Sequence, residues 1–374
     1  MSNFVEIQFR SDSRKDVRIV QRDKYNQRRL VMETSTARTT KEESSDSSSL
    51  TQVYQLVAEE FAAVNHLIPR KLTSDVAMVA EISQYIVESG GKRLRPMMVL
   101  LSSQALNYKG EQNVELAAII EFLHTATLLH DDVVDRSGLR RGRVTANEKW
   151  GNAPSVLVGD FLYSRAFQLM VELASLDIMG VLSGATNTIA EGEVMQLANV
   201  GNIELSEAGY REVIRCKTAL LFEAATHTGA LLAFEAGASK SRDHIETLRK
   251  YGLHFGLAYQ LVDDWLDYAG DTKAMGKNTG DDLAEGKLTL PLIQALKTTT
   301  DAEQSLIKKA LQNKSSEHMP DILAIVEKCG ALAYTHDAAI AETNLALECL
   351  TLLPDTPYKN ALSTLATLSL SRLG

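Results

Sequence analysis

Two short acidic motifs with the same spacing are the residues of this sequence best suited to chemistry. Residues 131–135 read Asp-Asp-Val-Val-Asp and residues 263–267 read Asp-Asp-Trp-Leu-Asp. In a helix, residues i and i+4 lie on one face, so the first and last aspartates of each motif point the same way. Like charges at this spacing destabilise an isolated helix. A hard cation relieves that repulsion, and Mg²⁺ is usually held by one or two carboxylates together with water and substrate phosphate. The pair of motifs predicts Mg²⁺ ions that hold a diphosphate between two helices.

Each motif alone is also compatible with a solvated helix face, because short acidic runs are common. Two copies, each at the end of an unusually apolar helix, favour the metal site. Carboxylates beside a deep apolar face indicate a pocket with a polar mouth and an apolar interior. The candidate catalytic acids are Asp131, Asp132, Asp135, Asp263, Asp264 and Asp267.

Basic residues near the acidic motifs complete a candidate diphosphate site. Residues 90–96 read GGKRLRP and place three cations behind two glycines, which allow the backbone to approach a ligand closely. Arginine offers a planar fork to phosphate oxygens and lysine a mobile point charge. Any one of these residues alone is more typical of a charged surface, and their adjacency to the acidic motifs is what favours binding. The other basic residues near the motifs are Arg140, Arg141, Lys217, Lys277 and Lys287, and Thr218 directly follows Lys217.

The overall composition excludes several classes of protein. A net charge of −9 argues against a nucleic-acid binder, which usually carries a basic surface. The three cysteines form no CxxC pair and no zinc spacing, so they are interpreted as core residues in a reducing compartment. No apolar run reaches the length of a membrane span, and the N-terminus has no apolar signal core. We therefore expect a cytoplasmic enzyme that acts on small molecules.

The elements that position these residues are predicted to be helices. Apolar residues recur at helical spacing, and no segment shows the alternation of a strand. The expected class is all-α, with a single helical domain over residues 50–374. Residues 1–49 are polar and rich in Ser and Thr, which predicts a disordered tail. The expected helices are 53–61, 76–86, 114–129, 156–173, 180–197, 210–229 and 245–268, with further helices from residue 290 onward.

Several longer motifs together resemble the trans-polyprenyl diphosphate synthase family. They are GGKRLRP, LLHDDVVDRSGLRRG, GDFLYSRAF, AEGEVMQL, KTALLFEAA, YQLVDDWLDY and GKNTGDDLAEGKLTLPL. The resemblance extends from near Gln55 to the C-terminus, and it is closest to the bacterial octaprenyl diphosphate synthases that make quinone side chains. It implies an isoprenoid-synthase bundle around a central apolar cavity, usually homodimeric. It also implies a Mg²⁺-dependent condensation of isopentenyl diphosphate with an allylic diphosphate such as farnesyl diphosphate.

The resemblance assigns expected roles to individual residues. His124 alone is more typical of a satisfied core histidine, but it lies two helical turns before Asp131, and the family match favours a substrate role. The positions that match the isopentenyl diphosphate site are Lys92, Arg95, His124 and Arg141. The positions that match magnesium ligands are Asp131, Asp135 and Asp263, with Asp132, Asp264 and Asp267 as neighbouring or water-mediated partners. The positions that match the allylic diphosphate site are Arg140, Lys217, Thr218, Gln260, Lys277 and Lys287, and Lys217 is also a candidate catalytic residue.

Small residues before the first motif indicate a long product. Moving backward from Asp131, a helix descends into the cavity by about 1.5 Å per residue, which makes Leu123, Ala126 and Thr127 candidates for the chain-length wall. Short-chain relatives carry large aromatic residues at the fourth and fifth positions before the motif, where this chain has Thr127 and Ala126. A product in the C30–C50 range is expected, with C40 favoured by the resemblance. Ala126 is also explained by a tight helix contact alone.

Two other functions share part of this pattern. A class I terpene cyclase also has an Asp-rich helix, but it normally carries an Asn/Ser/Glu-type second motif rather than a second Asp cluster. A non-catalytic subunit of a heteromeric synthase typically lacks one Asp cluster, and both are present here. For a synthase, the apolar product suggests a transient membrane contact during release.

Overall fold

The computed structural model describes residues 49–269 and 280–373. All but the last residue of the predicted tail therefore lies outside the described residues, as does Lys277. Residues 49–56 are helical. The labelled elements that follow are α2 (Ala58–Lys71), α3 (Ala77–Glu88), α4 (Leu94–Ala105), α5 (Gln112–Val134), β1 (Leu139–Arg140), β2 (Arg143–Val144), α6 (Ala146–Trp150), α7 (Asn152–Leu173), α8 (Leu176–Ala198), α9 (Glu207–Ile214), η1 (Arg215–Ala219), α10 (Leu220–Glu235), α11 (Asp243–Ala269), α13 (Asp281–Glu285), α14 (Leu290–Thr298), α15 (Asp301–Asn313), α16 (Met319–Lys328), α17 (Ala331–Leu350), α18 (Pro357–Leu370) and η2 (Ser371–Leu373).

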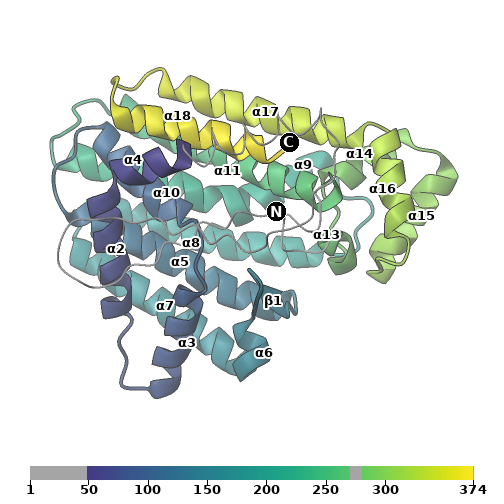
Figure 1. The fold of residues 1–374 in the computed structure, drawn as a ribbon, viewed down its shortest axis with the longest axis horizontal. Coiled ribbons are helices and arrows are strands. Elements are labelled where there is room, and N and C mark those ends of the chain that lie inside the picture. The colour runs from purple at the N-terminus through teal and green to yellow at the C-terminus, as the bar shows by residue number, and fades with distance from the viewer. Residues whose placement is uncertain (1–48, 270–279, 374) are drawn as a thin grey trace, which may run out of the picture.

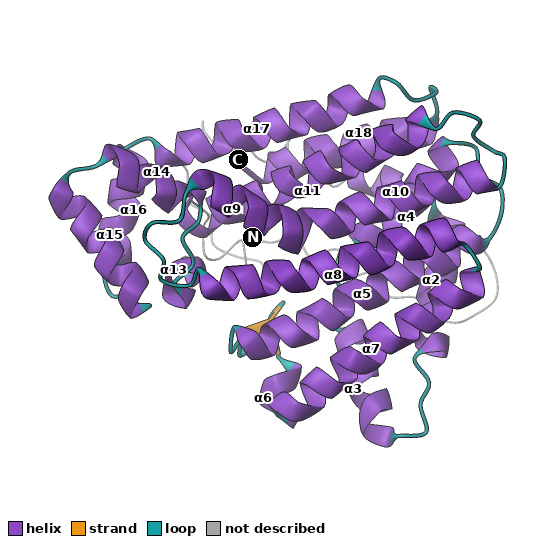
Figure 2. Ribbon diagram, turned by 180° about the vertical axis from the view of Figure 1, so that it is seen from behind, coloured by secondary structure: helices purple, strands orange, loops and turns teal. Residues whose placement is uncertain are grey.

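The long helices form an elongated bundle (Figure 1). Helices α17 and α18 run along one long side, and α10 and α11 lie beneath them. Helix α5 packs between α4 and α7. The shorter helices α14, α15 and α16 gather at one end of the bundle, as the reverse view also shows (Figure 2). This arrangement confirms the predicted all-α class.

Two clusters of buried side chains form the core, and α11 joins them. Its first half contributes Tyr251 and Phe255 to a cluster with α4, α5, α7 and α10. Its second half contributes Leu261 and Val262 to a cluster with α13–α17. Helix α4, which is not among the helices expected from the sequence, is buried from Pro96 to Ala105. Because this stretch is buried on all sides, polar Ser102, Ser103 and Gln104 included, it lacks the one-sided apolar pattern by which a surface helix is recognised.

The predicted helix 210–229 is interrupted in the structure. Helix α9 ends at Ile214, a π-helical turn follows over Arg215–Ala219, and α10 begins at Leu220. The π turn carries Lys217 and Thr218. Such turns occur as single insertions in α-helices, frequently at functional sites.

A small hairpin follows α5, where no strand was predicted. Leu139–Arg140 pairs with Arg143–Val144 in antiparallel fashion. The two residues between the strands, Arg141 and Gly142, have φ values of 53° and 74°. A two-residue turn of type I′ needs positive φ at both positions, which explains the glycine. The strands are too short to show an alternating pattern in the sequence.

Across the part of the chain that the structure describes, no helix combines the length and apolarity needed to span a bilayer.

Candidate active site

The first acidic motif lies at the C-terminal end of α5, where each outer aspartate faces a lysine from a distant segment. Oδ1 of Asp131 lies 3.9 Å from Nζ of Lys217, and Oδ2 of Asp135 accepts a hydrogen bond of 3.2 Å from Nζ of Lys287. Burial raises the pKa of Asp131, with Lys217 opposing the shift and Asp135 adding to it. Burial alone would lower the pKa of Lys287, but the carboxylates of Asp135 and Glu285 outweigh it and raise the pKa.

Glu193 of α8 joins this group although the sequence analysis gave it no role. Its Oε2 accepts a hydrogen bond of 2.6 Å from Nζ of Lys217. Burial, and then the charge of Asp131, raise the pKa of Glu193 to about 7. Lys217 therefore lies between two carboxylates that come from different helices. The motif AEGEVMQL contains Glu193. The distance in sequence between Glu193 and the aspartates does not predict its contact with Lys217.

The central aspartate of the first motif holds the hairpin. Asp132 is 1% exposed, and its Oδ1 accepts hydrogen bonds from Arg140 Nε at 2.8 Å and Nη2 at 2.7 Å. Its backbone oxygen accepts a hydrogen bond of 2.9 Å from the N–H of Ser137. These contacts place Arg140 beside the motif. Asp132 therefore contacts an arginine of the hairpin, whereas Asp131 and Asp135 face lysines.

The three aspartates of the second motif have three different kinds of partner. Oδ1 of Asp263 lies 2.7 Å from Nη2 of Arg372 in η2. Asp264 is buried and accepts hydrogen bonds from the Tyr210 hydroxyl and from Gln260 Nε2. Asp267 accepts hydrogen bonds of 3.2 and 3.3 Å from the backbone N–H groups of residues 281 and 282 at the start of α13. Burial raises the pKa of Asp264 well above its ordinary value, and raises that of Asp267 to about 8, with Asp282 adding to both shifts.

The segment from α13 to Lys287 connects the two acidic motifs. Its first residues donate to Asp267 in the second motif, and Lys287 donates to Asp135 in the first. The π turn makes a second connection, because Lys217 lies against Asp131 while Thr218 Oγ1 donates to Gln260 Oε1 at 2.7 Å. The two motifs, 132 positions apart in sequence numbering, therefore face a shared site.

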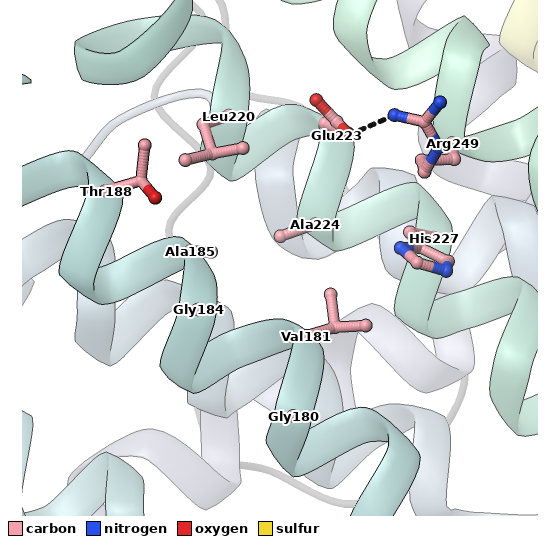
Figure 3. A pocket seen from close by; sticks show the side chains of 10 residues that line it. All are labelled: Gly180, Val181, Gly184, Ala185, Thr188, Leu220, Glu223, Ala224, His227 and Arg249. Atoms are coloured by element: carbon pink, nitrogen blue, oxygen red, sulfur yellow. Dashed lines mark hydrogen bonds and ion pairs between the residues drawn. The ribbon is translucent and has the colours of Figure 1, made fainter.

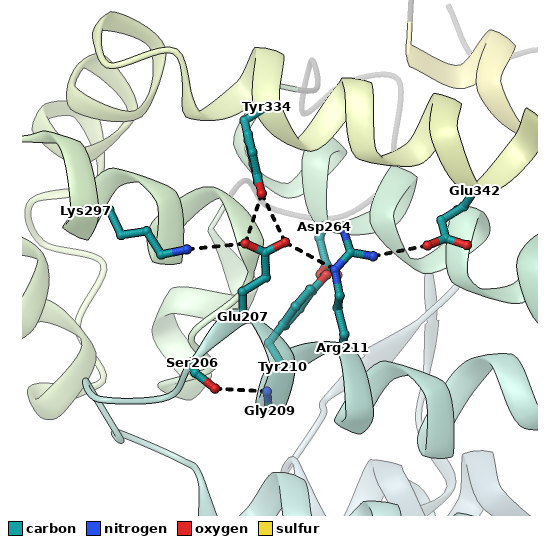
Figure 4. Close-up of polar contacts among 9 residues, drawn as sticks. All are labelled: Ser206, Glu207, Gly209, Tyr210, Arg211, Asp264, Lys297, Tyr334 and Glu342. Carbon is teal, nitrogen blue, oxygen red and sulfur yellow. Dashed lines mark hydrogen bonds and ion pairs between the residues drawn. The ribbon is translucent and has the colours of Figure 1, made fainter.

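A network of polar contacts fixes α9 beside this site (Figure 4). Tyr210 points toward Asp264, while Arg211 donates to Glu207 at 3.2 Å and to Glu342 of α17 at 3.1 Å. Tyr334 of α17 also donates to Glu207. The buried Asp264 is thus held by a helix that is itself tied to α17.

The GGKRLRP segment forms the start of α4 and places basic residues near α5. Nη1 of Arg95 lies 3.3 Å from Nε2 of His124, and its guanidinium lies 4.0 Å from the centre of the Phe222 ring. Burial lowers the pKa of Arg95 to about 10. Burial, followed by Arg95 and Arg141, also lowers the pKa of His124 well below its ordinary value. The Nε2 atom of a neutral His124 therefore accepts a hydrogen bond from Arg95, because arginine can only donate.

Gly91 brings the hairpin arginine into the same group. Its φ is +141°, and a Cβ at this position would collide with the guanidinium of Arg141. Lys92 is also nearby, and burial, followed by Arg372, lowers its pKa. The four positions predicted for isopentenyl diphosphate thus lie on α5, at the start of α4, and in the hairpin and the segment beside them.

A pocket of about 270 Å³ elsewhere in the bundle contains none of the predicted site residues. It lies between α8, α10 and α11 and is lined by small residues of α8, by His227 and by an ion pair of 2.6 Å between Arg249 and Glu223 (Figure 3). The charged groups that line it are already paired or far from the acidic motifs. We therefore place the candidate active site at the aspartates.

The donor set of the acidic motifs fits a hard divalent cation. All of the side chains that the motifs offer are carboxylates, the ligands that Mg²⁺ prefers. Among the described residues, no three His, Cys, Asp or Glu side chains are arranged to hold an ion by themselves. This agrees with a cation held by one or two carboxylates and completed by water and substrate oxygens.

Comparison with known proteins places the chain in a family. The family model for polyprenyl synthetases matches residues 76–329. The octaprenyl diphosphate synthase of Escherichia coli K12 is 46% identical over 324 residues, which cover 86% of this chain and 99% of that protein.

Two solved structures of polyprenyl synthases also resemble this fold. A decaprenyl diphosphate synthase from Rhodobacter capsulatus superposes with a TM-score of 0.82 at 43% identity, covering 87% of this chain and 99% of that one. A polyprenyl synthase from Caulobacter crescentus CB15, complexed with calcium and isoprenyl diphosphate, superposes with a TM-score of 0.82 at 42% identity, covering 86% and 97%. The chain therefore belongs to the polyprenyl synthetase family and is a prenyltransferase, which confirms the family predicted from the sequence motifs.

Proposed function

We propose that this prenyltransferase is a Mg²⁺-dependent trans-polyprenyl diphosphate synthase that adds isopentenyl diphosphate units to an allylic diphosphate such as farnesyl diphosphate. An octaprenyl product for quinone side chains is favoured. The observation that carries the proposal is the pair of acidic motifs connected through Lys217 and Lys287. The octaprenyl and decaprenyl products named for two relatives support a long chain without fixing its length.

In this proposal Mg²⁺ ions are held by Asp131 and Asp135 of the first motif and by Asp263 of the second, each ion being bound by one or two of these carboxylates. Bound there, Mg²⁺ would supply Lewis-acid neutralisation of the diphosphate leaving group. The calcium ion named with the Caulobacter crescentus relative supports a divalent cation in this family. Asp132, Asp264 and Asp267 have protein partners of their own and act as supports for Arg140, for the Gln260 side chain and for the α13 turn.

The chain's own basic residues complete the allylic diphosphate site. Lys217 and Lys287 already contact the first motif, and Arg140 is fixed next to it by Asp132. Each offers donors to the diphosphate oxygens, and preorganised cations stabilise the charge that develops on a departing group. Thr218 and Gln260, joined by their hydrogen bond, line the neighbouring turn, where their dipoles stabilise an allylic cation.

The second substrate site is assigned to Lys92, Arg95, His124 and Arg141. The two arginines offer planar forks for a second diphosphate. Neutral His124 holds Arg95 by accepting a hydrogen bond from its Nη1, which leaves the remaining N–H donors of Arg95 for a ligand. The Nε atom of Arg95 is buried with no hydrogen-bond partner among the described residues. This N–H group is therefore available to donate to a bound diphosphate.

The product-length wall is assigned to α5 below the first motif. Ala126 and Leu123 are buried, and Thr127 is half-buried with its hydroxyl donating to the backbone of His124. Thr127 and Ala126 leave room that an aromatic residue would fill. Because Ala126 is fully buried, its packing against neighbouring helices accounts for its size as well.

A homodimer is also proposed, through α7 and α8. These two helices expose large apolar side chains, of which Leu176 is 83% and Leu157 66% exposed. Apolar patches of this kind on a protein surface mark interaction sites, and most oligomers pair the same surface of two copies. The other members of the exposed group are Phe167, Val171, Val194 and Leu197. The cytoplasmic location and the transient membrane contact during product release stay predictions.

Product analysis tests the proposed function directly. The purified protein is incubated with farnesyl diphosphate, labelled isopentenyl diphosphate and Mg²⁺, and chain lengths are measured after dephosphorylation. A dominant C40 alcohol that disappears on chelation is expected. Cyclic hydrocarbons would indicate a cyclase, and no turnover with any allylic primer would indicate a non-catalytic subunit.

A further inference from the structure

The C-terminal turn brings an arginine onto the second acidic motif. Helix α18 leads into η2, where Leu373 is 7% exposed and packs into the second core cluster. With Leu373 fixed in the core, the preceding Arg372 lies against α11. Its Nη2 is 2.7 Å from Oδ1 of Asp263, and its guanidinium lies 5.2 Å from the centre of the Tyr259 ring.

Arg372 remains charged in this position. Burial alone would lower its pKa, but the charge of Asp263 and contacts with Asp263 and Tyr259 outweigh burial and raise it. Its Nη1 is buried with no hydrogen-bond partner among the described residues. A buried donor without a partner is unfavourable. The guanidinium of Arg372 therefore forms an ion pair through Nη2 while the hydrogen-bonding capacity of its Nη1 is not satisfied by the described residues.

The outer aspartates of the two motifs differ in the kind of cation they meet. Asp131 and Asp135 of the first motif face lysines that also contact Glu193 and Glu285. Asp263 instead meets a guanidinium from the end of the chain, and this is its only ion pair among the described residues. That guanidinium occupies one of the two oxygens of the carboxylate that the proposed function assigns to a metal ion.

We propose that Arg372 is an internal counter-cation of the second acidic motif, which neutralises Asp263 in the metal-free enzyme and competes there with the divalent cation. The inference depends on the proposed function, because it takes Asp263 as a metal ligand. A guanidinium 2.7 Å from the carboxylate oxygen and a metal ion on the same oxygen would repel each other at short range. Metal binding must therefore displace Arg372 from Asp263, which weakens the apparent affinity for the metal.

The consequence is a gain of metal affinity when the arginine is removed. A partly exposed ion pair contributes at most about 1 kcal/mol, so its loss corresponds to a change of about two- to fivefold in the dissociation constant. Most substitutions near an active site weaken binding. A tighter metal complex in a variant that loses a side chain is thus a result that a merely structural role of Arg372 would not produce.

The test is a Mn²⁺ titration of the full chain without substrate, followed by electron paramagnetic resonance of the free ion. Arg372→Gln is compared with the wild type, with Asp263→Asn, and with Lys359→Gln as a control for net charge. Lys359 lies on α18, which leads into η2, and precedes Arg372 by thirteen residues, or about 20 Å along the helix axis. We expect Arg372→Gln to bind Mn²⁺ about two- to fivefold more tightly, Lys359→Gln to match the wild type, and Asp263→Asn to bind more weakly.

Two results would overturn the proposal and can be told apart. In the first, Asp263→Asn binds Mn²⁺ more weakly than the wild type, while Arg372→Gln binds Mn²⁺ as tightly as the wild type or less tightly. The competition between Arg372 and the metal is then refuted, and the assignment of Asp263 as a metal ligand stands. If Asp263→Asn binds Mn²⁺ like the wild type, Asp263 is not a ligand, and both the competition and that part of the proposed function fail.

Discussion

Glu193 offers a sharp test of the electrostatics of the site, because its partly buried carboxylate contacts Lys217, which also faces Asp131 of the first acidic motif. Burial, and then Asp131, raise its pKa from the usual 4.5 to about 7. A carboxyl group whose pKa is raised by folding binds its proton more tightly in the native state. Its contribution to stability is fully present below pH 4.5 and is lost as the pH rises through 7.

Glu193→Gln should therefore stabilise the metal-free protein at high pH and leave it unchanged at low pH. Glutamine resembles the protonated acid in shape and stays neutral, so it avoids the cost of ionising a buried group. The pKa difference corresponds to about 3 kcal/mol, at about 1.36 kcal/mol for each pH unit. Since unfolding entropy is about 2.1 cal/mol/K per residue, we expect Tm to rise by about 5 °C at pH 8.

The assay is thermal unfolding in a chelator at pH 5 and pH 8, followed by circular dichroism. Glu191→Gln is the matched control, because Glu191 lies on the same helix but is exposed. The control should behave like the wild type at both pH values. If Glu193→Gln raises Tm equally at both, or lowers it at pH 8, then the buried charge is not the source of the effect and the reasoning is refuted.

Two further perturbations follow from the contacts of α5. Arg140→Gln should destabilise the protein by about 3 kcal/mol in urea unfolding. The reason is that the carboxylate of Asp132, which is 1% exposed, loses its two arginine donors. A loss of stability below about 1 kcal/mol would contradict the described pairing. Ala126→Phe should shift products toward shorter chains in the dephosphorylation assay and cost about 1–3 kcal/mol of stability, since Ala126 is fully buried. An unchanged product distribution in a folded Ala126→Phe variant would count against this part of α5 as the wall.

The acidic motifs and their helices could be predicted because their signals are local. An i, i+4 pair of aspartates after an apolar run defines both a helix end and a metal preference. The structure places Asp131 and Asp135 at the end of α5 and Asp263 near the end of α11, as expected. Lys217 and Lys287 could be associated with them only through the family resemblance, because their contacts span 86 and 152 positions of sequence.

Other parts of the site depend on packing that the sequence does not display. The π turn at Arg215–Ala219 has no signature of its own, and the predicted helix simply continues through it. Arg372 meets Asp263 only because Leu373 is buried in the core. Tyr210 and Glu193 have ordinary positions on amphipathic helices, and their roles emerge only when α8, α9 and α11 are brought together.

The most direct test of the central claim compares Asp131→Ala and Asp263→Ala with the wild type in a steady-state assay of isopentenyl diphosphate incorporation at saturating Mg²⁺. Near-UV circular dichroism confirms that each variant is folded. If the two motifs hold the metal that activates the allylic diphosphate, each substitution should lower kcat by roughly 100-fold or more. Turnover within about tenfold of the wild type in either folded variant, a barrier change of only about 1.4 kcal/mol, would contradict the account.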